Sequence, residues 1–272
     1  MIELPEATVL ANQLQKTVGK KITDLILNQN PHKLVWFYDQ GAHYEDILKN
    51  QTITAVMSYG GQVVIVVPKG KLVLGDGINI RYQPQTPPLR HQLALELDHK
   101  EHLYFFASMY GGIVCFSNQD PEYLYYQIAK EKPSPLSESF NLKYWNTLFE
   151  IKENLSLKAF LATNQRIPGI GNGVIQDILW RAKLHPKQKI DELTERDKTI
   201  LFQTLKGTLQ EMINQKGRAS EKDIYGEAGY FKLFSSFASC PVCSNPIIKE
   251  AYLGGSIYYC PSCQKESKRK KS

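Results

Sequence analysis

Four of the five cysteines form the clearest chemical pattern in the 272-residue chain. They lie in the last 33 residues as two CxxC pairs, with sixteen residues between the pairs. Thiolates at this spacing are typical of a four-cysteine zinc ribbon. Because four protein ligands leave a tetrahedral zinc ion no open position, we expect one structural Zn²⁺ rather than a catalytic one. The expected ligands are Cys240, Cys243, Cys260 and Cys263.

A glycine-rich stretch, Ile167-Pro-Gly-Ile-Gly-Asn-Gly173, precedes a helical pattern. Backbone N–H groups near Asn172 should point outward from the positive end of the helix dipole and favour a phosphate. Ordinary capping by Asn172 explains the same residues equally well. No Lys-Ser or Lys-Thr follows, and a helix rather than a strand comes before, so neither a Walker loop nor a Rossmann fingerprint is indicated.

Two acids close to the chain start, Glu3 and Glu6, are of a type that transfers protons in catalysis. Acids at such positions also favour the first turn of a helix. Taken alone, the helical interpretation is the simpler one.

Several blocks together resemble the formamidopyrimidine-DNA glycosylase and endonuclease VIII family. Their order and spacing extend over nearly the whole chain, which makes chance agreement improbable. Besides the cysteine pairs, the blocks are Glu3-Leu-Pro-Glu6, Lys158-Ala-Phe-Leu-Ala-Thr-Asn-Gln165, Pro168-Gly-Ile-Gly-Asn172 and His185-Pro186.

The resemblance implies an α+β fold in three parts. A leading helix and a two-sheet antiparallel β-sandwich are followed by a helical domain with a helix-two-turn-helix, and then by the zinc ribbon. DNA would lie in the cleft between the two halves. We place a catalytic-type sandwich over residues 1–130, a linker over 131–145, the DNA-binding helical domain over 146–234, and the ribbon with a basic tail over 235–272.

The resemblance also implies catalytic roles at the chain start. Glu3 would be the general acid and base, and Glu6 its supporting carboxylate. Met1 and Ile2 occupy the end of the chain that carries the family's nucleophile. An amine there attacks the sugar C1′, a carboxyl group moves the protons, and a Schiff base divides one hard step into easier ones.

The DNA contacts implied by the resemblance come from both halves. Lys158 and Asn172 would bind phosphates that flank the lesion, and Tyr110 would hold the duplex open once the damaged nucleotide has flipped out. Residues 217–230 match the position of the family's lesion-recognition loop. The full expected set is Lys158, Asn172, Tyr110, Gly171, Arg218 and Tyr230.

Two departures from the family bear on catalysis. Ile2 stands where the family has its N-terminal proline nucleophile, so a retained Met1 offers a primary amine displaced by one residue. Gln62 stands where a strand lysine is usual, and glutamine cannot form an imine. Lys69 and Lys71 lie on the adjacent turn as substitutes. We therefore predict a DNA N-glycosylase of base excision repair with weak or absent AP-lyase activity, and the alternative is a non-catalytic protein that binds damaged DNA.

The elements that must position these residues change character along the chain. Apolar spacing predicts a helix within residues 5–18, then short strands at 34–38, 53–57, 63–67, 71–74, 92–97 and 103–106. The polar segment Lys130–Ser139, with two prolines, is the expected linker. Helical periodicity follows at 148–161, 174–182 and 193–213, with Asp191 as a candidate cap.

Composition and charge agree with a DNA-binding protein but do not establish one. The net charge is +6, which favours a polyanionic partner. No apolar run of membrane-spanning length and no leader peptide occurs. Cysteines grouped for metal binding suit a reducing compartment. We expect a cytoplasmic monomer whose partner is double-stranded DNA with a damaged base or an abasic site, and no membrane.

Overall fold

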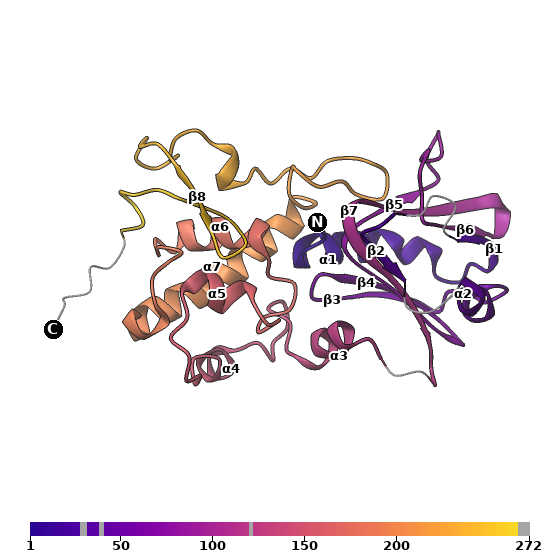
Figure 1. Ribbon diagram of the computed structural model, residues 1–272, viewed down its shortest axis with the longest axis horizontal. Coiled ribbons are helices and arrows are strands. Elements are labelled where there is room, and N and C mark those ends of the chain that lie inside the picture. Colours follow the sequence, from indigo (N-terminus) through magenta and orange to yellow (C-terminus); the bar gives the residue numbers. More distant parts are fainter. Residues whose placement is uncertain (28–31, 38–40, 120–121, 266–272) are drawn as a thin grey trace.

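The computed structural model describes residues 1–27, 32–37, 41–119 and 122–265. These form a β-rich half and a helical half, with the N-terminus between them (Figure 1). Hydrogen bonds and buried side chains from both halves meet at the chain start. The expected basic tail, Lys268–Lys271, and Tyr38 at the end of the first expected strand lie outside the described residues.

The β-rich half contains seven strands in one curled sheet. The order is β1-β6-β7-β5-β4-β3 with antiparallel neighbours, and β2 pairs with β7 in parallel. The strands are β1 (Ile22–Leu27), β2 (Val35–Phe37), β3 (Ala55–Tyr59), β4 (Gln62–Val67), β5 (Gly70–Tyr82), β6 (Leu93–Leu97) and β7 (Glu101–Ser117).

The two long strands, β5 and β7, run through both parts of the curled sheet. Residues 70–76 of β5 pair with 111–117 of β7, and residues 78–82 pair with 103–107. The register shifts between Asp76 and Ile78. A side chain on Gly77 would overlap the carbonyl oxygen of Tyr110. Glycine therefore permits a bulge that brings Asp76 and Tyr110 beside the chain start.

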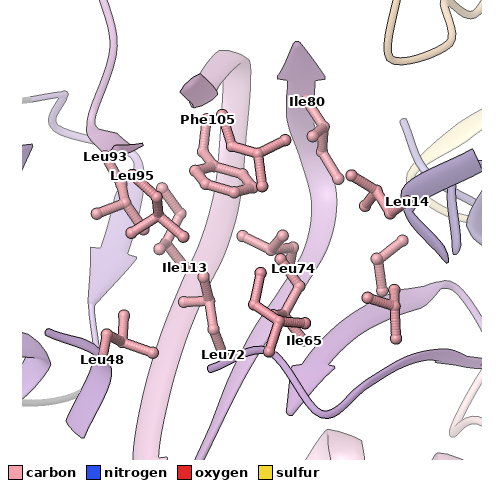
Figure 2. Packing of buried hydrophobic residues seen from close by; sticks show 14 of the residues in the cluster. Leu14, Leu48, Ile65, Leu72, Leu74, Ile80, Leu93, Leu95, Phe105 and Ile113 are labelled. Carbon is pink, nitrogen blue, oxygen red and sulfur yellow. The ribbon is translucent and has the colours of Figure 1, made fainter. Parts of the chain in front are cut away.

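The core of the β-rich half lies between the sheet and two helices, α1 (Leu4–Leu14) and α2 (Gly41–Leu48). Leu14 of α1 is fully buried and packs with Ile65, Leu74 and Ile80 from the strands (Figure 2). Leu4, at the other end of α1, belongs to the separate core of the helical half. The short helix α1 thus joins the two cores.

The helical half packs around aromatic side chains. Trp145 and Phe160 are fully buried, with ring centroids 6.1 Å apart. The hairpin strands β8 and β9 follow the helices, and β9 contacts α6. The elements are α3 (Leu124–Glu131), α4 (Leu142–Thr147), α5 (Leu157–Ala162), α6 (Asn172–Arg181), α7 (Glu195–Asn214), β8 (Ile248–Tyr252) and β9 (Gly255–Tyr259).

The α+β class is confirmed, while several boundaries differ from the expected ones. The helix expected from residue 148 begins only at Leu157, because Ser156 accepts a hydrogen bond from Ala159 N and caps it. The helix expected at 193–213 is capped by Thr194, whose hydroxyl accepts from Asp197 N, and not by Asp191. The linker expected over 131–145 is too long, because its last residue, Trp145, is buried in the helical core.

The two halves touch where the β3–β4 turn meets the loop before α6. Gly169 has φ +82°, and a Cβ there would lie 2.6 Å from Gly61 N and would overlap the carbonyl carbon of Gly60. Its carbonyl accepts a hydrogen bond from Leu4 N at 2.9 Å. Only glycine fits this position without displacing the turn.

We predict that Gly169→Ala lowers the free energy of unfolding by about 2 to 4 kcal/mol, the sum of positive-φ strain and overpacking. The matched change Gly207→Ala lies within α7, where the added Cβ has no atom within 4 Å apart from its chain neighbours and the nearby backbone of its own helix. It should raise the free energy of unfolding by about 0.5 to 1 kcal/mol. Urea denaturation followed by circular dichroism measures both, and equal midpoints for the two variants would contradict the close contact.

Candidate active site

A cleft of about 450 Å³ opens between the two halves beside the chain start. Met1, Ile2 and Glu3 form one wall. Strand residues, including Gln62 and Asp76, form another, and the loop before α6 closes the far side. The cleft therefore collects side chains from both halves around the first three residues.

Glu3 occupies the N-terminus of α6. Its Oε1 accepts a hydrogen bond from Gly173 N at 2.8 Å, and its Oε2 accepts from Val174 N at 2.9 Å. Gly171 is the N-cap, and a Cβ there would lie 2.7 Å from Glu3 Oε1. Since a carboxylate already satisfies these N–H groups, the expectation that they bind a phosphate is corrected, and so is the alternative that Asn172 caps the helix.

The pKa of Glu3 reflects opposing influences. Burial raises it, Arg218 lowers it, Glu6 raises it, and the two backbone N–H groups lower it. The net effect is a pKa above the ordinary value. A carboxyl group that is 3% exposed and holds its proton more strongly than usual suits a residue that both donates and accepts protons.

Glu6 lies behind Glu3 and binds Arg218. Its Oε1 accepts from Arg218 N at 3.1 Å and from Nε at 2.8 Å, and its Oε2 accepts from Nη2 at 2.6 Å. Its Oε2 also accepts from Glu3 N at 3.2 Å. Arg218 is 2% exposed. Arg218 was expected to contact DNA, but in this structure its guanidinium faces the carboxylates of Glu3 and Glu6 in the interior.

The first two residues are held by contacts to both halves. The α-ammonium of Met1 is 2.7 Å from Glu221 Oε2, and Ile2 N donates to Asp76 O at 2.6 Å. The hydroxyl of Tyr110 is 3.1 Å from the sulfur of Met1. Tyr110 thus rests on Met1, next to the cleft, and its expected role as an aromatic wedge stays a prediction. Glu221 was not anticipated, since nothing local in the sequence links it to the chain start.

Gln62 is 9% exposed and lines the cleft, and its Oε1 has no hydrogen-bond partner among the described residues. The expected substitutes for a lysine at this position point elsewhere. Lys69 Nζ donates to Asp46 O at 3.0 Å, and Lys71 Nζ is 3.8 Å from Glu122. Within the described part of the chain, neither lysine lines the cleft.

Lys158 and Asn172 meet at the turn of the C-terminal hairpin. Lys158 is 3% exposed, its Nζ donates to Tyr252 O, and burial lowers its pKa. A Cβ on Gly255 would lie 2.7 Å from Asn172 Nδ2 and 3.4 Å from Lys158 Nζ. The sequence-predicted residues are therefore adjacent, with Asn172 exposed and Lys158 covered.

Residues 217–230 form a strap that leaves the end of α7 and reaches the β-rich half. Ile224 is fully buried in the β-rich core, and its carbonyl accepts from Tyr82 N at 2.9 Å. Arg81 Nη1 donates to Asp223 O at 3.0 Å. At the far end Tyr230 is 66% exposed, so it is available to a partner.

The four cysteines come together as predicted. Their Sγ atoms all lie within 4.8 Å of one another, the one such group of potential metal ligands in the described residues. Gln264 connects the group to the helical half: its Oε1 accepts from Cys260 N and its Nε2 donates to Leu184 O, both at 2.9 Å. Four converging thiols fit a tetrahedral metal ion.

No helix in the described ranges is both long enough and apolar enough to cross a membrane.

Comparisons with known proteins agree on one group. A family model described as the formamidopyrimidine-DNA glycosylase H2TH domain matches residues 132–223. A formamidopyrimidine-DNA glycosylase of Histophilus somni (strain 2336) is 28% identical over 281 residues, which covers 98% of this chain and 100% of that protein. One from Geotalea uraniireducens (strain Rf4) is 28% identical over 276 residues, covering 97% and 100%.

Solved structures share the fold. The MutM (Fpg) protein of Thermus thermophilus has a TM-score of 0.81 at 23% identity, covering 98% of this chain and 100% of that one. Lactococcus lactis Fpg in complex with DNA that contains an abasic site has a TM-score of 0.83 at 21% identity, covering 97% and 100%. The same Lactococcus protein with N7-benzyl-Fapy-dG DNA also scores 0.83, at 22% identity and the same coverage.

Another buried acid, Asp177, joins α6 to the segment that leads into the ribbon. It is 1% exposed, and its Oδ1 accepts from Phe234 N at 3.0 Å. Its Oδ2 has no hydrogen-bond partner among the described residues. Burial raises the pKa of Asp177 to about 7 from an ordinary value of 3.8. Between about pH 4 and pH 7 the folded protein therefore keeps a proton on Asp177 that the unfolded chain has released.

Because the folded-state pKa is the higher one, the stability from Asp177 falls as pH rises from about 4 to 7. We predict that the change in the free energy of unfolding caused by Asp177→Asn is more favourable at pH 8 than at pH 5, by roughly 2 to 4 kcal/mol. Thermal and urea unfolding at the two pH values measure this. The surface change Asp46→Asn should have the same small effect at both, and an Asp177→Asn effect independent of pH would refute the assignment.

Proposed function

We propose that the chain, which is similar to formamidopyrimidine-DNA glycosylases over nearly its whole length, binds double-stranded DNA at a damaged base or abasic site and acts in base excision repair as a DNA N-glycosylase. One observation carries the catalytic part: Glu3 is buried at the N-terminus of α6 and faces the cleft beside Met1. Relatives of matching length that are named as glycosylases support the same activity.

In the proposed reaction the damaged nucleotide is flipped out and its C1′ comes to rest beside Glu3. The bond from C1′ to the base breaks, its electron pair leaves with the base, and the departing base takes up the proton of the Glu3 carboxyl group, which becomes a carboxylate. A water molecule supplies the new bond to C1′ and gives its proton to the Glu3 carboxylate. Glu6 supports Glu3 through the Glu3 backbone N–H. This route is hydrolysis and needs no amine.

AP-lyase activity requires an amine that forms a Schiff base with C1′. The α-amine of Met1 is at the cleft, but it is an ammonium paired with Glu221. Position 62 offers an amide instead of an amine. We therefore propose that strand cleavage is weak or absent.

Contacts to the duplex are assigned to exposed groups around the cleft. Asn172 and Tyr230 present exposed side chains, and Gly171 and Lys158 lie beside Asn172. Tyr110 would leave Met1 and take the place of the extruded nucleotide. Lys158 would reach a phosphate once the hairpin turn moves away from it. We further propose that the protein acts as a monomer in the cytoplasm.

A non-catalytic protein that binds damaged DNA is the second candidate. Ile2 and Gln62 favour it, because both of the family's amine positions are changed. The two candidates differ in whether a base is released.

The deciding experiment uses tag-free protein with labelled duplexes that carry oxidised purines, oxidised pyrimidines, alkylated bases or an abasic site. We predict base release, seen as strand breaks only after hot alkali. Glu3→Gln should lower the single-turnover rate by about 10²- to 10⁴-fold and leave lesion binding intact, because it removes the proton acceptor. The surface variant Glu138→Gln should behave like wild type.

Other outcomes select other functions. Breaks without alkali, together with a borohydride-trapped complex, would mean that an amine forms the Schiff base. Tight lesion binding without release by the wild type would select the non-catalytic candidate.

We propose that the cysteine group binds one structural Zn²⁺. Wild-type protein should contain one zinc per chain, and Cys263→Ser should lose it together with affinity for DNA, because the hairpin beside Asn172 is no longer held. Cys115→Ala removes the remaining cysteine, outside the group, and should keep the zinc. Elemental analysis and duplex binding measure both, and full zinc occupancy in Cys263→Ser would refute the assignment.

A further inference from the structure

The guanidinium of Arg218 is enclosed by the residues at the chain start. Besides its two hydrogen bonds to the Glu6 carboxylate, its Nη2 donates to the Met1 carbonyl at 2.7 Å, and its Nη1 is 3.4 Å from Glu3 Oε1. One planar cation thus touches both catalytic carboxylates and the backbone of Met1. A bidentate guanidinium fixes geometry as well as charge.

Glycines make room for this arrangement. A Cβ on Gly173 would overlap Arg218 Nη1, and one on Gly229 would overlap the carbonyl oxygen of Gly217. Gly217 has φ +94°, which L side chains rarely adopt. The backbone on both sides of Arg218 is therefore shaped to deliver the side chain inward.

The strap that carries Arg218 is fixed at its middle. Gln13 of α1 donates to Asp223 Oδ2 at 2.8 Å and accepts from Ile224 N at 3.3 Å. Ile224 itself is in the β-rich core. These contacts hold the segment that follows Arg218 against the β-rich half.

We propose that Arg218 is a positioning residue for base excision, whose guanidinium holds Glu3 against the N-terminus of α6 and Glu6 against the Glu3 backbone. The proposal rests on the proposed glycosylase function. In it the strap contributes to catalysis by placing the buried Arg218 side chain beside Glu3 and Glu6. Glu3 remains the group that exchanges protons.

The charges around the site explain why a cation is needed. Glu3 and Glu6 are 3% and 5% exposed and lie close enough to repel each other when both are ionised. Glu221 and Asp76 add further carboxyl groups near Met1, and Tyr110 also faces Glu3. Arg218 and the Met1 ammonium are the cations in contact with this group in the described residues. Without Arg218, the pKa of Glu3 would rise further, because burial raises it and the neighbouring opposite charge is gone.

The test compares Arg218→Met and Arg218→Lys with Arg181→Met, a control that removes an α6 arginine paired with Glu211. Single-turnover base release is measured from pH 5 to 9 and lesion binding at pH 7. We expect Arg218→Met to lower the rate by about 10²-fold or more with nearly unchanged affinity. The pH limb that belongs to Glu3 should move upward by about one to three units, because an opposite charge is lost.

Arg218→Lys keeps one charge but not the planar fork. Its pH limb should therefore lie close to that of the wild type, while its single-turnover rate should stay close to that of Arg218→Met. Arg218→Lys also serves as the test if Arg218→Met fails to fold, which circular dichroism reveals. A pH limb that stays in place in the folded Arg218 variants, with a rate change no larger than that of Arg181→Met, would overturn the proposal.

A measurement independent of activity separates this proposal from the proposed function. The pKa of Glu3 is followed by ¹³C NMR of protein labelled at glutamate side chains, with Glu3→Gln to assign the signal. A Glu3 pKa that rises in Arg218→Met, and rises less in Arg218→Lys, supports the positioning role even if no base is released. A Glu3 pKa that is unchanged in folded Arg218→Met overturns it even if the wild type is an active glycosylase.

Discussion

The contact between the Glu3 carboxylate and the first N–H groups of α6 is the interaction on which the rest of the site depends. It joins a residue from the chain start to a helix of the other half, and it satisfies donors that would otherwise need water or a ligand. It also fixes where the two halves meet beside the cleft, because Leu4 packs in the helical core while the rest of α1 packs in the β-rich core. A change that displaced this carboxylate would therefore disturb the join between the halves as well as the chemistry.

Burying Glu3 here has an electrostatic cost that the surrounding structure offsets. The helix N-terminus contributes about half a positive charge, and Arg218 contributes a full one. The strap must cross from α7 to the β-rich half to deliver that charge, which accounts for the burial of Ile224 and the glycines at Gly217 and Gly229. The bulge at Gly77 completes the enclosure from the sheet side, where Asp76 and Tyr110 contact the first two residues.

Sequence reasoning succeeded where the determining interactions are local or follow a fixed spacing. The two CxxC pairs, the start of α6 after its glycines, and the α+β class were predictable, because metal ligation and helix signals are encoded within a few residues. The inward direction of Arg218 was not, because it depends on Glu6, 212 residues away along the chain. The same reason explains the error at α6, where a carboxylate 170 residues away takes the place expected for a phosphate. The predicted start of a helix near residue 148 was wrong for a different reason: the periodic apolar residues there pack in turns, and the helix begins only after the cap at Ser156.

The departures at positions 2 and 62 affect one part of the chemistry and leave another in place. A protonated amine has no lone pair, so Met1 can attack C1′ only after it loses a proton and leaves Glu221. Gln62 supplies neither a charge nor a nucleophile, and its unpartnered oxygen is an acceptor that suits a donor on a bound ligand. In the proposed hydrolysis water needs only a nearby base, and the contacts that hold Glu3 in the cleft involve neither Ile2 nor Gln62. Hydrolytic release of a base therefore requires less rearrangement of this site than amine-dependent strand cleavage does.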